Sequence, residues 1–544
     1  MRKCFILALL AGFLAVPAHA QTNLWQLAKD SGTVHRFSTL FTAQDVRDSL
    51  SSATASDEAM RWCKASGVTK VYLEEFRDGY QADHATLERA RDHFLKQGFL
   101  VSGCVTTTRV GKASDHWSSA ISCYTDPATQ NHLQSIFEYA AGLFDEIMID
   151  DFWFTDCTCS NCDAARRSQV VAIGSRTYPV SGDMWSDYRR ELMLHLSEDR
   201  LLAAAKSVNP KVRLIIKYPQ WYDKFQERGY DVTRETAVFD RIWVGTETRD
   251  YTNAHWGHTP QYEGYFLMRW LGGIGGEKCG GGWYDWLGTT EHTYLEQARQ
   301  TVLAGARESM LFCFGGLHRE TGPADMEALR NNLPELLAVA REVQRCKPVG
   351  IAAYKPPNSS PQDEPYVFDF AGMIGLPLVP CHQFPTNAPA AFLSVHALSD
   401  LNLPSELGPF IQTGRPVLLT DSLARRIGNQ INLKATNVYV LNVQSHPDSL
   451  LALSQARLDD LRTPLLSALH TTFQAPNRVA LYLFSSDRGV VPISSDSEGP
   501  SRAALNSLTN EGWVVENFNN EPVTVVLNGQ SLSIAARGWI CHWN

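Results

Sequence analysis

The chain has no run of basic residues, and beyond its first twenty residues no apolar stretch approaches the ~18–20 residues of a membrane helix. It has no internal repeat and no low-complexity segment. Its 49 Lys and Arg residues are outnumbered by 58 Asp and Glu, which gives a formal net charge of −9. Without a basic patch the chain offers no electrostatic footprint for nucleic acid or for an anionic membrane surface. We therefore expect no nucleic-acid partner and no membrane partner.

Several catalytic motifs are also missing. No G-x-S-x-G sequence is present, so the nucleophile elbow of the α/β-hydrolases is excluded. The stretch "GGIGGEKC" resembles a phosphate loop but has Cys where Ser or Thr must follow the Lys. The sequence "HWGH" at 255–258 contains a His pair without a third metal ligand nearby.

The first twenty residues have the pattern of a bacterial secretory signal: a basic "MRK", an apolar "CFILALLAGFLAV" and a final "PAHA". We expect cleavage between Ala20 and Gln21 and a mature protein in the periplasm or outside the cell. Of the 12 cysteines only Cys4 lies in this segment. An odd number of thiols remains, so at least one is free or bound to something other than Cys.

From residue 35 to about 345, short apolar runs alternate with segments of helical periodicity. The eight strand candidates are 35–41, 68–75, 98–106, 145–151, 212–218, 240–247, 264–270 and 309–316. Eight such strands, most of them followed by a helix, predict a (β/α)₈ TIM barrel, with a doubly wound parallel sheet as the alternative.

The pattern changes twice after the predicted barrel. Strand runs such as "IAAY" and "RPVLLTD" alternate with helical segments up to about residue 475, and only strand runs follow. We expect a signal peptide at 1–20, a catalytic barrel at 21–345, a Rossmann-like α/β domain at 346–475 and a small C-terminal β-sandwich at 476–544.

In a TIM barrel the chemistry lies where the strands end, and acidic residues gather at those positions here. Asp150 and Asp151 end the fourth predicted strand, Glu247 ends the sixth, and Glu277 lies in a Gly-rich loop after the seventh. Cleavage of a glycosidic bond needs one carboxylic acid to protonate the leaving oxygen and a second carboxylate to attack the sugar or activate water. These four residues are the candidate catalytic acids, with Glu247 preferred over Glu277 as the partner of the Asp pair.

Structural roles for the same residues stay open. Asp150 can pair with Lys217 or Arg269, and Asp151 can cap the following turn. Because neighbouring strand residues face opposite ways, we expect only one of the two Asp side chains to face the barrel mouth. Glu247 can bind Arg249 or Arg269, and Glu277 can be an exposed turn residue.

Further polar and aromatic residues at strand ends, or in the loops that follow them, are candidates for binding a carbohydrate substrate through hydrogen bonds or through stacking on a pyranose face. They are Glu75, Trp153, Lys217, Tyr218, Trp221, Arg249, Arg269, Trp270, Trp283 and Asp285. Each tryptophan of this set can equally be a packing residue.

Three cysteines follow the fourth predicted strand with the spacing C-x-C-x-x-C: Cys157, Cys159 and Cys162. Cys123 lies in the loop after the third predicted strand. Adjacent barrel strands bring these two loops side by side, and four converging thiolates form a closed tetrahedral zinc site. Disulfides are the alternative in an oxidising compartment, although Cys157 and Cys159 would close too small a ring.

This arrangement resembles glycoside hydrolase family 42, the β-galactosidases. The resemblance implies a structural zinc in the four-Cys site and a Rossmann-like middle domain used in trimer formation. We expect no organic cofactor. That family has Asn-Glu at the end of strand four and a Glu nucleophile at strand seven, whereas this chain has Asp150-Asp151 and no Glu at the predicted seventh strand end. Acids at strands four and six look more like the α-galactosidase type of barrel.

The sequence therefore predicts a secreted glycoside hydrolase that acts on an oligo- or polysaccharide. A barrel protein that binds carbohydrate without cleaving it is the alternative, motivated by the missing family Glu. Turnover of aryl glycosides separates the two.

Overall fold

The structure is a computed structural model that describes residues 23–116, 119–485 and 512–543. The predicted signal segment at 1–20 lies outside the described residues. Within them, no helix combines the length and the apolar character needed to cross a bilayer.

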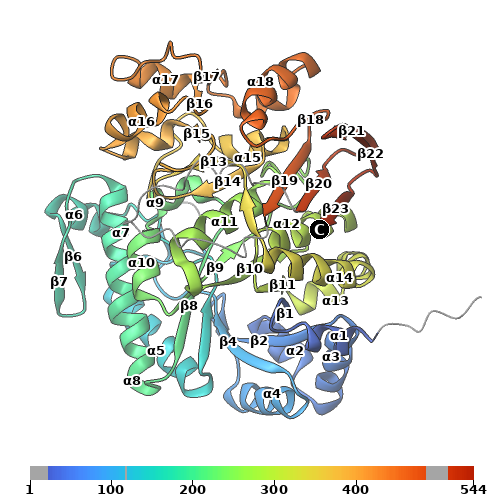
Figure 1. Ribbon diagram of the computed structural model, residues 1–544. Helices are drawn as coiled ribbons and strands as arrows, with labels where there is room; N and C mark the ends of the chain where they lie inside the picture. Colours follow the sequence, from blue (N-terminus) through green and yellow to red (C-terminus); the bar gives the residue numbers. More distant parts are fainter. Residues whose placement is uncertain (1–22, 117–118, 486–511, 544) are drawn as a thin grey trace, which may run out of the picture.

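Eight parallel strands form a closed barrel, as the sequence predicts (Figure 1). Neighbouring strands pair in the order β1, β2, β4, β5, β8, β9, β10 and β11, and β11 returns to β1. Their bounds are β1(Arg36–Phe41), β2(Val68–Arg77), β4(Leu100–Val105), β5(Glu146–Ile149), β8(Arg213–Tyr218), β9(Arg241–Gly245), β10(Cys279–Asp285) and β11(Glu308–Phe312). The short strand β3(Tyr80–Gln81) folds back on β2, and β6(Val170–Ile173) pairs with β7(Arg176–Pro179) in a separate hairpin.

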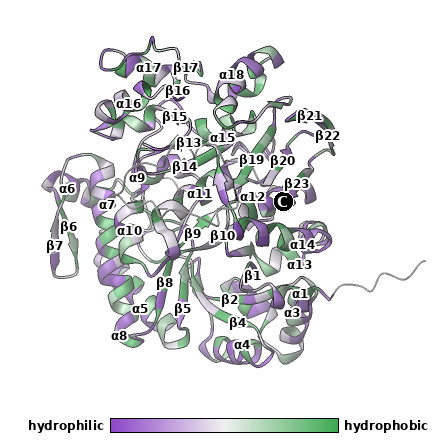
Figure 2. Ribbon diagram, in the orientation of Figure 1, coloured by the Kyte–Doolittle hydropathy of each residue, from purple (hydrophilic) through white to green (hydrophobic). Residues whose placement is uncertain are grey.

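The barrel helices begin at capping residues that the sequence provides. Asp83 caps α4, and Asp126 followed by Pro127 begins α5. The helices of this part are α1(Leu24–Asp30), α2(Ala43–Ser49), α3(Ala53–Ala65), α4(His84–Lys96), α5(Pro127–Leu143), α6(Ser160–Ser168), α7(Trp185–Leu196), α8(Ala203–Val208), α9(Phe225–Arg228), α10(Val232–Val238), α11(Glu263–Gly275), α12(Glu291–Leu303), α13(Phe314–His318) and α14(Gly322–Arg345). Many of them have one hydrophobic and one hydrophilic face (Figure 2).

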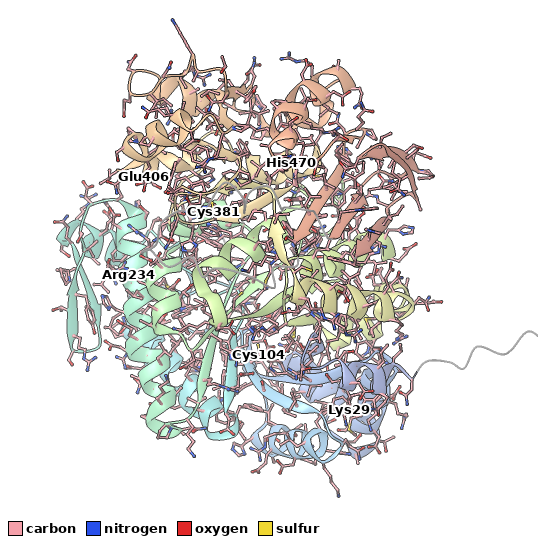
Figure 3. The ribbon with its side chains drawn as sticks, in the orientation of Figure 1. Lys29, Cys104, Arg234, Cys381, Glu406 and His470 are labelled. Carbon is pink, nitrogen blue, oxygen red and sulfur yellow. The ribbon has the colours of Figure 1, made fainter. Side chains whose placement is uncertain are left out.

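The barrel interior is filled by one side chain from each strand. These residues are Leu40, Tyr72, Cys104, Met148, Ile215, Trp243, Trp283 and Met310, all buried. Of these residues, Cys104 is labelled in Figure 3. Because strand side chains alternate, the next inward position on each strand is two residues further toward the C-terminal end.

The seventh predicted strand is wrong: residues 264–270 lie in helix α11, and β10 is the seventh barrel strand. Helix α11 contacts β9 on the barrel and β14 of the following sheet, so nearly all of its side chains are buried. Its first half contains a short run of apolar residues, and periodicity alone does not distinguish such a run in a buried helix from a buried strand.

Strand β10 escaped prediction because its first half is glycine. A Cβ at Gly281 would lie 2.3 Å from the carbonyl oxygen of Glu308, and one at Gly280 would lie 2.6 Å from the indole nitrogen of Trp243. The close approach of neighbouring strands therefore requires the glycines that in sequence resemble a loop.

Two further regions follow the barrel. A parallel five-stranded sheet places its second strand first, then the first, third, fourth and fifth, which is a doubly wound order. Its elements are β13(Ile351–Tyr354), β14(Leu378–Cys381), β15(Ala391–Leu393), β16(Val417–Thr420), β17(Val438–Leu441), α15(Val367–Met373), α16(Leu403–Gln412), α17(Asp421–Ile427) and α18(Gln455–Ser467).

The last strands form two antiparallel sheets beside this region (Figure 1). They are β12(Lys347–Val349), β19(Val479–Ser485), β20(Gly512–Asn517) and β23(Trp539–Trp543) in one sheet, and β18(Phe473–Gln474), β21(Val523–Leu527) and β22(Gln530–Ile534) in the other. Strand β12 precedes the parallel sheet in the sequence but pairs with β19.

Candidate active site

The C-terminal end of the barrel carries a layer of charged side chains directly above the apolar interior. On β2, β5, β8 and β10, the residue two positions after the interior residue is charged. These four residues are Glu74, Asp150, Lys217 and Asp285. All four are buried, and Glu247 joins them two residues after β9 ends. The period-2 alternation of the strands therefore builds a ring of carboxylates around one ammonium group.

Lys217 is the centre of this ring. Its Nζ lies 2.5 Å from Glu247 Oε1, 2.9 Å from Asp151 Oδ2 and 3.7 Å from Asp150 Oδ1. The ammonium also lies 4.2 Å from the ring centroid of Trp283. Burial alone would lower the pKa of Lys217, but the three carboxylates outweigh it and raise that pKa. The residue is therefore a fixed positive charge.

Asp150 is locked from several sides. Its Oδ2 accepts from Arg77 Nη2 at 2.7 Å and from the Thr106 hydroxyl at 3.0 Å, and its Oδ1 accepts from the backbone N–H of Asp151. Burial would raise its pKa, but the charges of Lys217 and Arg77 prevail and hold the pKa below the ordinary value. Asp150 is thus an ionised group with little access to solvent.

Asp151 and Glu247 differ from Asp150 in protonation. Burial raises the pKa of Asp151 to about 6, with Asp150 adding to the effect and Lys217 opposing it. Burial likewise raises the pKa of Glu247 to about 8, with Lys217 opposing and the charges of Asp151 and Asp285 adding. At neutral pH Glu247 therefore holds a proton while Asp151 is mostly ionised.

The two Asp side chains both reach Lys217, although we expected only one to face the mouth. Asp150 continues the alternation of β5, but Asp151 lies in the turn after the strand, which ends at Ile149, so its side chain need not face the opposite way. The Asp151 side chain is 16% exposed against 3% for Asp150, which leaves Asp151 the more accessible of the pair.

A second buried ion pair holds the other side of the mouth. Arg249 binds Asp285 with two hydrogen bonds, Nε–Oδ1 at 3.0 Å and Nη2–Oδ2 at 2.6 Å. With its amide oriented to satisfy both neighbours, Gln220 donates to Glu247 Oε2 at 2.8 Å and accepts from Arg249 at 3.2 Å. Glu247 is therefore held by Lys217 on one oxygen and by Gln220 on the other.

Several predicted binding residues lie outside the mouth. Glu75 points away from Glu74, and its carboxylate accepts from Gln81 at 2.6 Å. Tyr218 alternates with Lys217 and contacts Thr236 behind the strand at 3.3 Å. Three predicted tryptophans are also packing residues in this structure: Trp153, Trp270 and Trp283 are all fully buried. Trp221 is half-buried and packs edge-on against Phe154.

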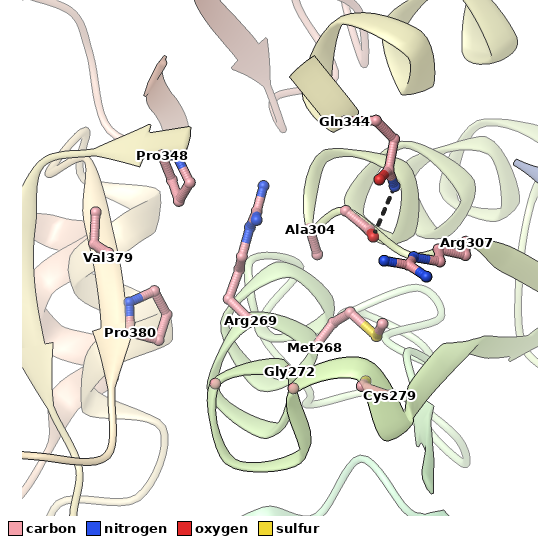
Figure 4. Close-up of a pocket in the computed structure, with 13 residues that line it drawn as sticks. Met268, Arg269, Gly272, Cys279, Ala304, Arg307, Gln344, Pro348, Val379 and Pro380 are labelled. Atoms are coloured by element: carbon pink, nitrogen blue, oxygen red, sulfur yellow. Dashed lines mark hydrogen bonds between the residues drawn. The ribbon is translucent and has the colours of Figure 1, made fainter. Parts of the chain in front are cut away.

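Three further predicted residues lie away from the mouth, because the seventh barrel strand is β10 and not residues 264–270. Glu277 precedes β10, at the opposite end of the barrel, where its exposed carboxylate pairs with Arg307 at 3.0 Å. Arg269 and Trp270 lie on helix α11. Arg269 lines a cavity of about 340 Å³ between α11 and residues 348 and 379–380 (Figure 4). Its Nη2 donates to the Leu303 carbonyl.

The mouth also contains residues that the sequence analysis did not assign. Glu74 accepts from Arg77 at 2.8 Å and from the backbone N–H of Ala43, and Phe312 stacks on Trp283. The inward direction of Glu74 follows from Tyr72 two residues earlier, but the sequence alone does not show which of the two residues, Glu74 or Glu75, lies in register with the interior.

The four predicted cysteines converge beside the mouth, in the loops after β4 and β5. All four thiols are free, and their sulfur atoms lie within 4.8 Å of one another. Three of the Sγ–Sγ distances are 3.6, 3.7 and 3.7 Å. A tetrahedron with metal–sulfur bonds of about 2.3 Å has edges of roughly 3.8 Å, whereas a disulfide needs about 2.05 Å. The cluster can therefore bind a metal ion.

Comparisons with known proteins agree with this geometry. A protein-family model described as the catalytic domain of a probable glycosyl hydrolase matches residues 21–332. An uncharacterized protein from Saccharolobus solfataricus is 27% identical over 334 residues, which cover 58% of this chain and 55% of that protein. The match thus spans about half the length of that relative.

Two solved structures share the overall fold. An α-L-fucosidase isoenzyme from Paenibacillus thiaminolyticus aligns with a TM-score of 0.59 at 8% identity, over 94% of this chain and 100% of that one. A catalytic mutant of a family 42 β-galactosidase from G. stearothermophilus aligns with a TM-score of 0.58 at 10% identity, over 94% and 98%. At these identities the likeness concerns the fold alone.

Proposed function

This chain belongs to the family described as the catalytic domain of probable glycosyl hydrolases. We propose that it is a glycoside hydrolase that cleaves O-glycosidic bonds of an oligo- or polysaccharide with Glu247 and Asp151. The observation that carries the proposal is the single ammonium group of Lys217, which binds both carboxyl groups at the barrel mouth. The substrate is a carbohydrate, and the mouth is where it binds.

Glu247 is the proton donor. A general acid must keep its proton at the working pH and release it to the leaving oxygen. Burial and two neighbouring carboxylates raise its pKa to about 8, so the protonated form prevails at neutral pH. Hydrogen bonds from Lys217 and Gln220 fix the direction of the carboxyl group.

Asp151 is the nucleophile. It is the more accessible Asp of the pair, and Lys217 stabilises its charged form. Lys217 Nζ lies 2.9 Å from Asp151 Oδ2 and 2.5 Å from Glu247 Oε1. The distance between these two carboxylate oxygens therefore cannot exceed the sum of the two distances. Such closeness supports a retaining mechanism, which uses a separation of about 5–5.5 Å against about 6.5–9.5 Å for inversion.

Asp150 and Arg77 act through their neighbours. Asp150 remains ionised between Arg77 and Lys217, and its charge raises the pKa of Asp151. In this role Asp150 positions Lys217 and balances its charge but does not touch the sugar.

Glycosyl fluorides and 4-nitrophenyl glycosides of the common neutral hexoses and 6-deoxyhexoses test these roles. Fluoride leaves without protonation, so Glu247→Gln retains far more activity on the fluoride than on an unactivated disaccharide, whereas Asp151→Asn loses activity on both. Azide restores turnover of the fluoride by Glu247→Gln, because this anion attacks the anomeric carbon of the glycosyl-enzyme without needing a general base. A glycosyl azide forms and the Asp151 carboxylate is released. Equal losses on both substrates for the two variants would refute the assignment.

We also propose that the metal at the cysteine cluster is zinc, held by Cys123, Cys157, Cys159 and Cys162. Thiolate ligands in a closed tetrahedral set are typical of structural zinc, which here would join the loops after β4 and β5. Elemental analysis of the purified protein would give about one zinc per chain, with the four thiols protected from alkylation until a chelator is added. Absence of zinc together with disulfides among these four residues would refute it.

Export and assembly remain proposals. The composition of residues 1–20 supports secretion, and a mature protein that begins at Gln21 in N-terminal sequencing tests it. The domain order supports a homotrimer by analogy only. A light-scattering mass near that of one chain, 60.6 kDa for the full sequence, would count against the trimer.

A further inference from the structure

One aromatic side chain beside the mouth is only partly covered by its neighbours. Among the tryptophans of the described residues only Trp256 is exposed, with 40% of its surface accessible. It lies in the loop that follows β9, nine residues after Glu247. An exposed indole presents an apolar face that can stack on a ligand while its N–H stays hydrated.

This loop is held in a defined shape. The side chain of Asn253 accepts hydrogen bonds from the backbone N–H groups of His255 and Trp256, at 3.0 and 2.9 Å. A Cβ at Gly288, in the loop after β10, would lie 2.7 Å from Cβ of Trp256, so the two loops are in close contact. Trp256 is therefore positioned by backbone hydrogen bonds and packing.

The indole is also connected to the proton donor. The guanidinium of Arg249 lies 5.1 Å from the ring centroid of Trp256. The same guanidinium binds Asp285 and contacts Gln220, which donates to Glu247. Trp256 thus belongs to the side of the mouth from which the leaving oxygen is protonated.

We propose that Trp256 is a stacking platform for the sugar ring on the leaving-group side of the scissile bond. This inference rests on the proposed role of Glu247, because a proton donor must lie beside the leaving oxygen. The exposed indole presents an apolar surface for the C–H face of a neutral pyranose, and Arg249 supports the ring through its cationic face contact. The ligand class is a neutral di- or oligosaccharide.

The test compares two substrates of the same sugar in Trp256→Ala. A glycosyl fluoride has no leaving-group ring, whereas the corresponding disaccharide has one. We expect the ratio of kcat/KM for the disaccharide to that for the fluoride to fall about tenfold, the size of one aromatic contact. Trp256→Phe retains a ring and should lose only about twofold to threefold.

The matched control is Leu401→Ala, which removes a side chain that is 95% exposed and lies far along the chain from the barrel. It should leave the ratio unchanged. If Trp256 only shielded the Arg249–Asp285 pair, its removal would lower both substrates equally and shift the alkaline limb of the pH profile. An unchanged ratio in Trp256→Ala would overturn the platform.

Binding measurements separate this inference from the proposed function. Calorimetry with the same disaccharides compares Glu247→Gln with Glu247→Gln/Trp256→Ala, and the second replacement should weaken Kd about tenfold. Equal Kd values, or no binding by either variant, overturn the platform. A different outcome is also informative: the wild-type protein cleaves none of the probes, but binding still depends on Trp256. That outcome refutes the catalytic roles of Glu247 and Asp151 and leaves the platform standing.

Discussion

The two ends of the barrel each hold a buried lysine bound by carboxylates, and they differ in charge balance. At the N-terminal end Lys70 lies 2.8 Å from Glu146 and 3.5 Å from Glu308, with Tyr72 at 2.7 Å. At the mouth Lys217 lies 2.5 Å from Glu247 and 2.9 Å from Asp151. One motif therefore occurs twice in the same barrel.

The balance of positive and negative side chains differs between the Lys70 end, which we expect to be structural, and the Lys217 end, which we expect to be catalytic. Two arginines also pair with the carboxylates near Lys70, Arg213 with Glu146 and Arg36 with Glu308, so cations outnumber acids there. Burial would raise the pKa of Glu146, but Lys70 outweighs it and lowers that pKa. At the mouth three cations face five carboxyl groups, which are Glu74, Asp150, Asp151, Glu247 and Asp285. Burial raises the pKa of Glu247, and the excess of acid at the mouth adds to that effect.

The largest expected difference between the two ends is in activity. Glu247→Gln should lower kcat/KM for an unactivated disaccharide by roughly 10³–10⁴-fold, because it removes a proton used in the transition state. Glu146→Gln should leave kcat/KM within about threefold but lower the free energy of unfolding by about 3 kcal/mol, since it breaks a buried ion pair. Steady-state kinetics and urea unfolding measure the two effects.

The opposite results for Glu146→Gln and Glu247→Gln would contradict the assignment of the two barrel ends. If Glu146→Gln lost activity at unchanged stability while Glu247→Gln only lost stability, the N-terminal end would be the chemical one. A double variant should show additive effects, because the two sites lie at opposite ends of the barrel.

A second comparison lies within the mouth, between the two Asp residues. Asp151→Asn should lose about 10⁴-fold in kcat on both fluoride and disaccharide, because the nucleophile is gone. Asp150→Asn should lose less, roughly 10²-fold, and should lower the pKa of Asp151 because a neighbouring negative charge disappears. Pre-steady-state kinetics on the fluoride separate the two. A larger loss for Asp150→Asn would exchange their roles.

The sequence located this ring only in part, and the reasons are physical. Strand ends at Asp150, Lys217 and Glu247 could be predicted because β5, β8 and β9 are short apolar runs with ordinary boundaries. Asp285 was assigned to a loop because β10 begins with glycines that close strand contact requires. The predicted number of eight barrel strands was still right, because the apolar run of α11 was counted as a strand in place of β10.

The choice between neighbouring residues needed the structure. Glu74 and Glu75 are adjacent, and a register shift after Glu74 in the pairing of β2 with β4 interrupts the alternation. Which acids share Lys217 depends on side-chain reach across the barrel. No sequence spacing encodes that distance.

The pH profile sharpens the comparison with a smaller effect. Below the pKa of Asp151, about 6, the nucleophile is protonated and kcat/KM falls as pH decreases. Above the pKa of Glu247, about 8, the acid is ionised and kcat/KM falls as pH increases. We expect a bell with about tenfold loss per pH unit outside these limits, whose apparent pKa values belong to the coupled pair.

Two variants test the cause of the alkaline limb. Asp285→Asn removes a negative neighbour of Glu247, lowers the pKa of that carboxyl group and moves the limb to lower pH. Glu146→Gln, at the other end of the barrel, should leave both limbs in place. An alkaline limb that stays fixed in Asp285→Asn would contradict the charge argument.

The smallest expected effect concerns Glu277, the remaining predicted acid. Its side chain is 85% exposed at the N-terminal end of β10, and Arg307 pairs with it at the surface. Surface ion pairs contribute about 0–1 kcal/mol, so Glu277→Gln should change neither kcat/KM nor the pH limbs by more than about twofold. Glu247→Gln is the matched variant: it makes the same Glu-to-Gln change at another position. Any difference in activity between the two variants is therefore due to position. A loss of activity in Glu277→Gln comparable to that of Glu247→Gln would mean that the glycine-rich segment reaches the substrate, and that the two ends of the barrel are not chemically distinct.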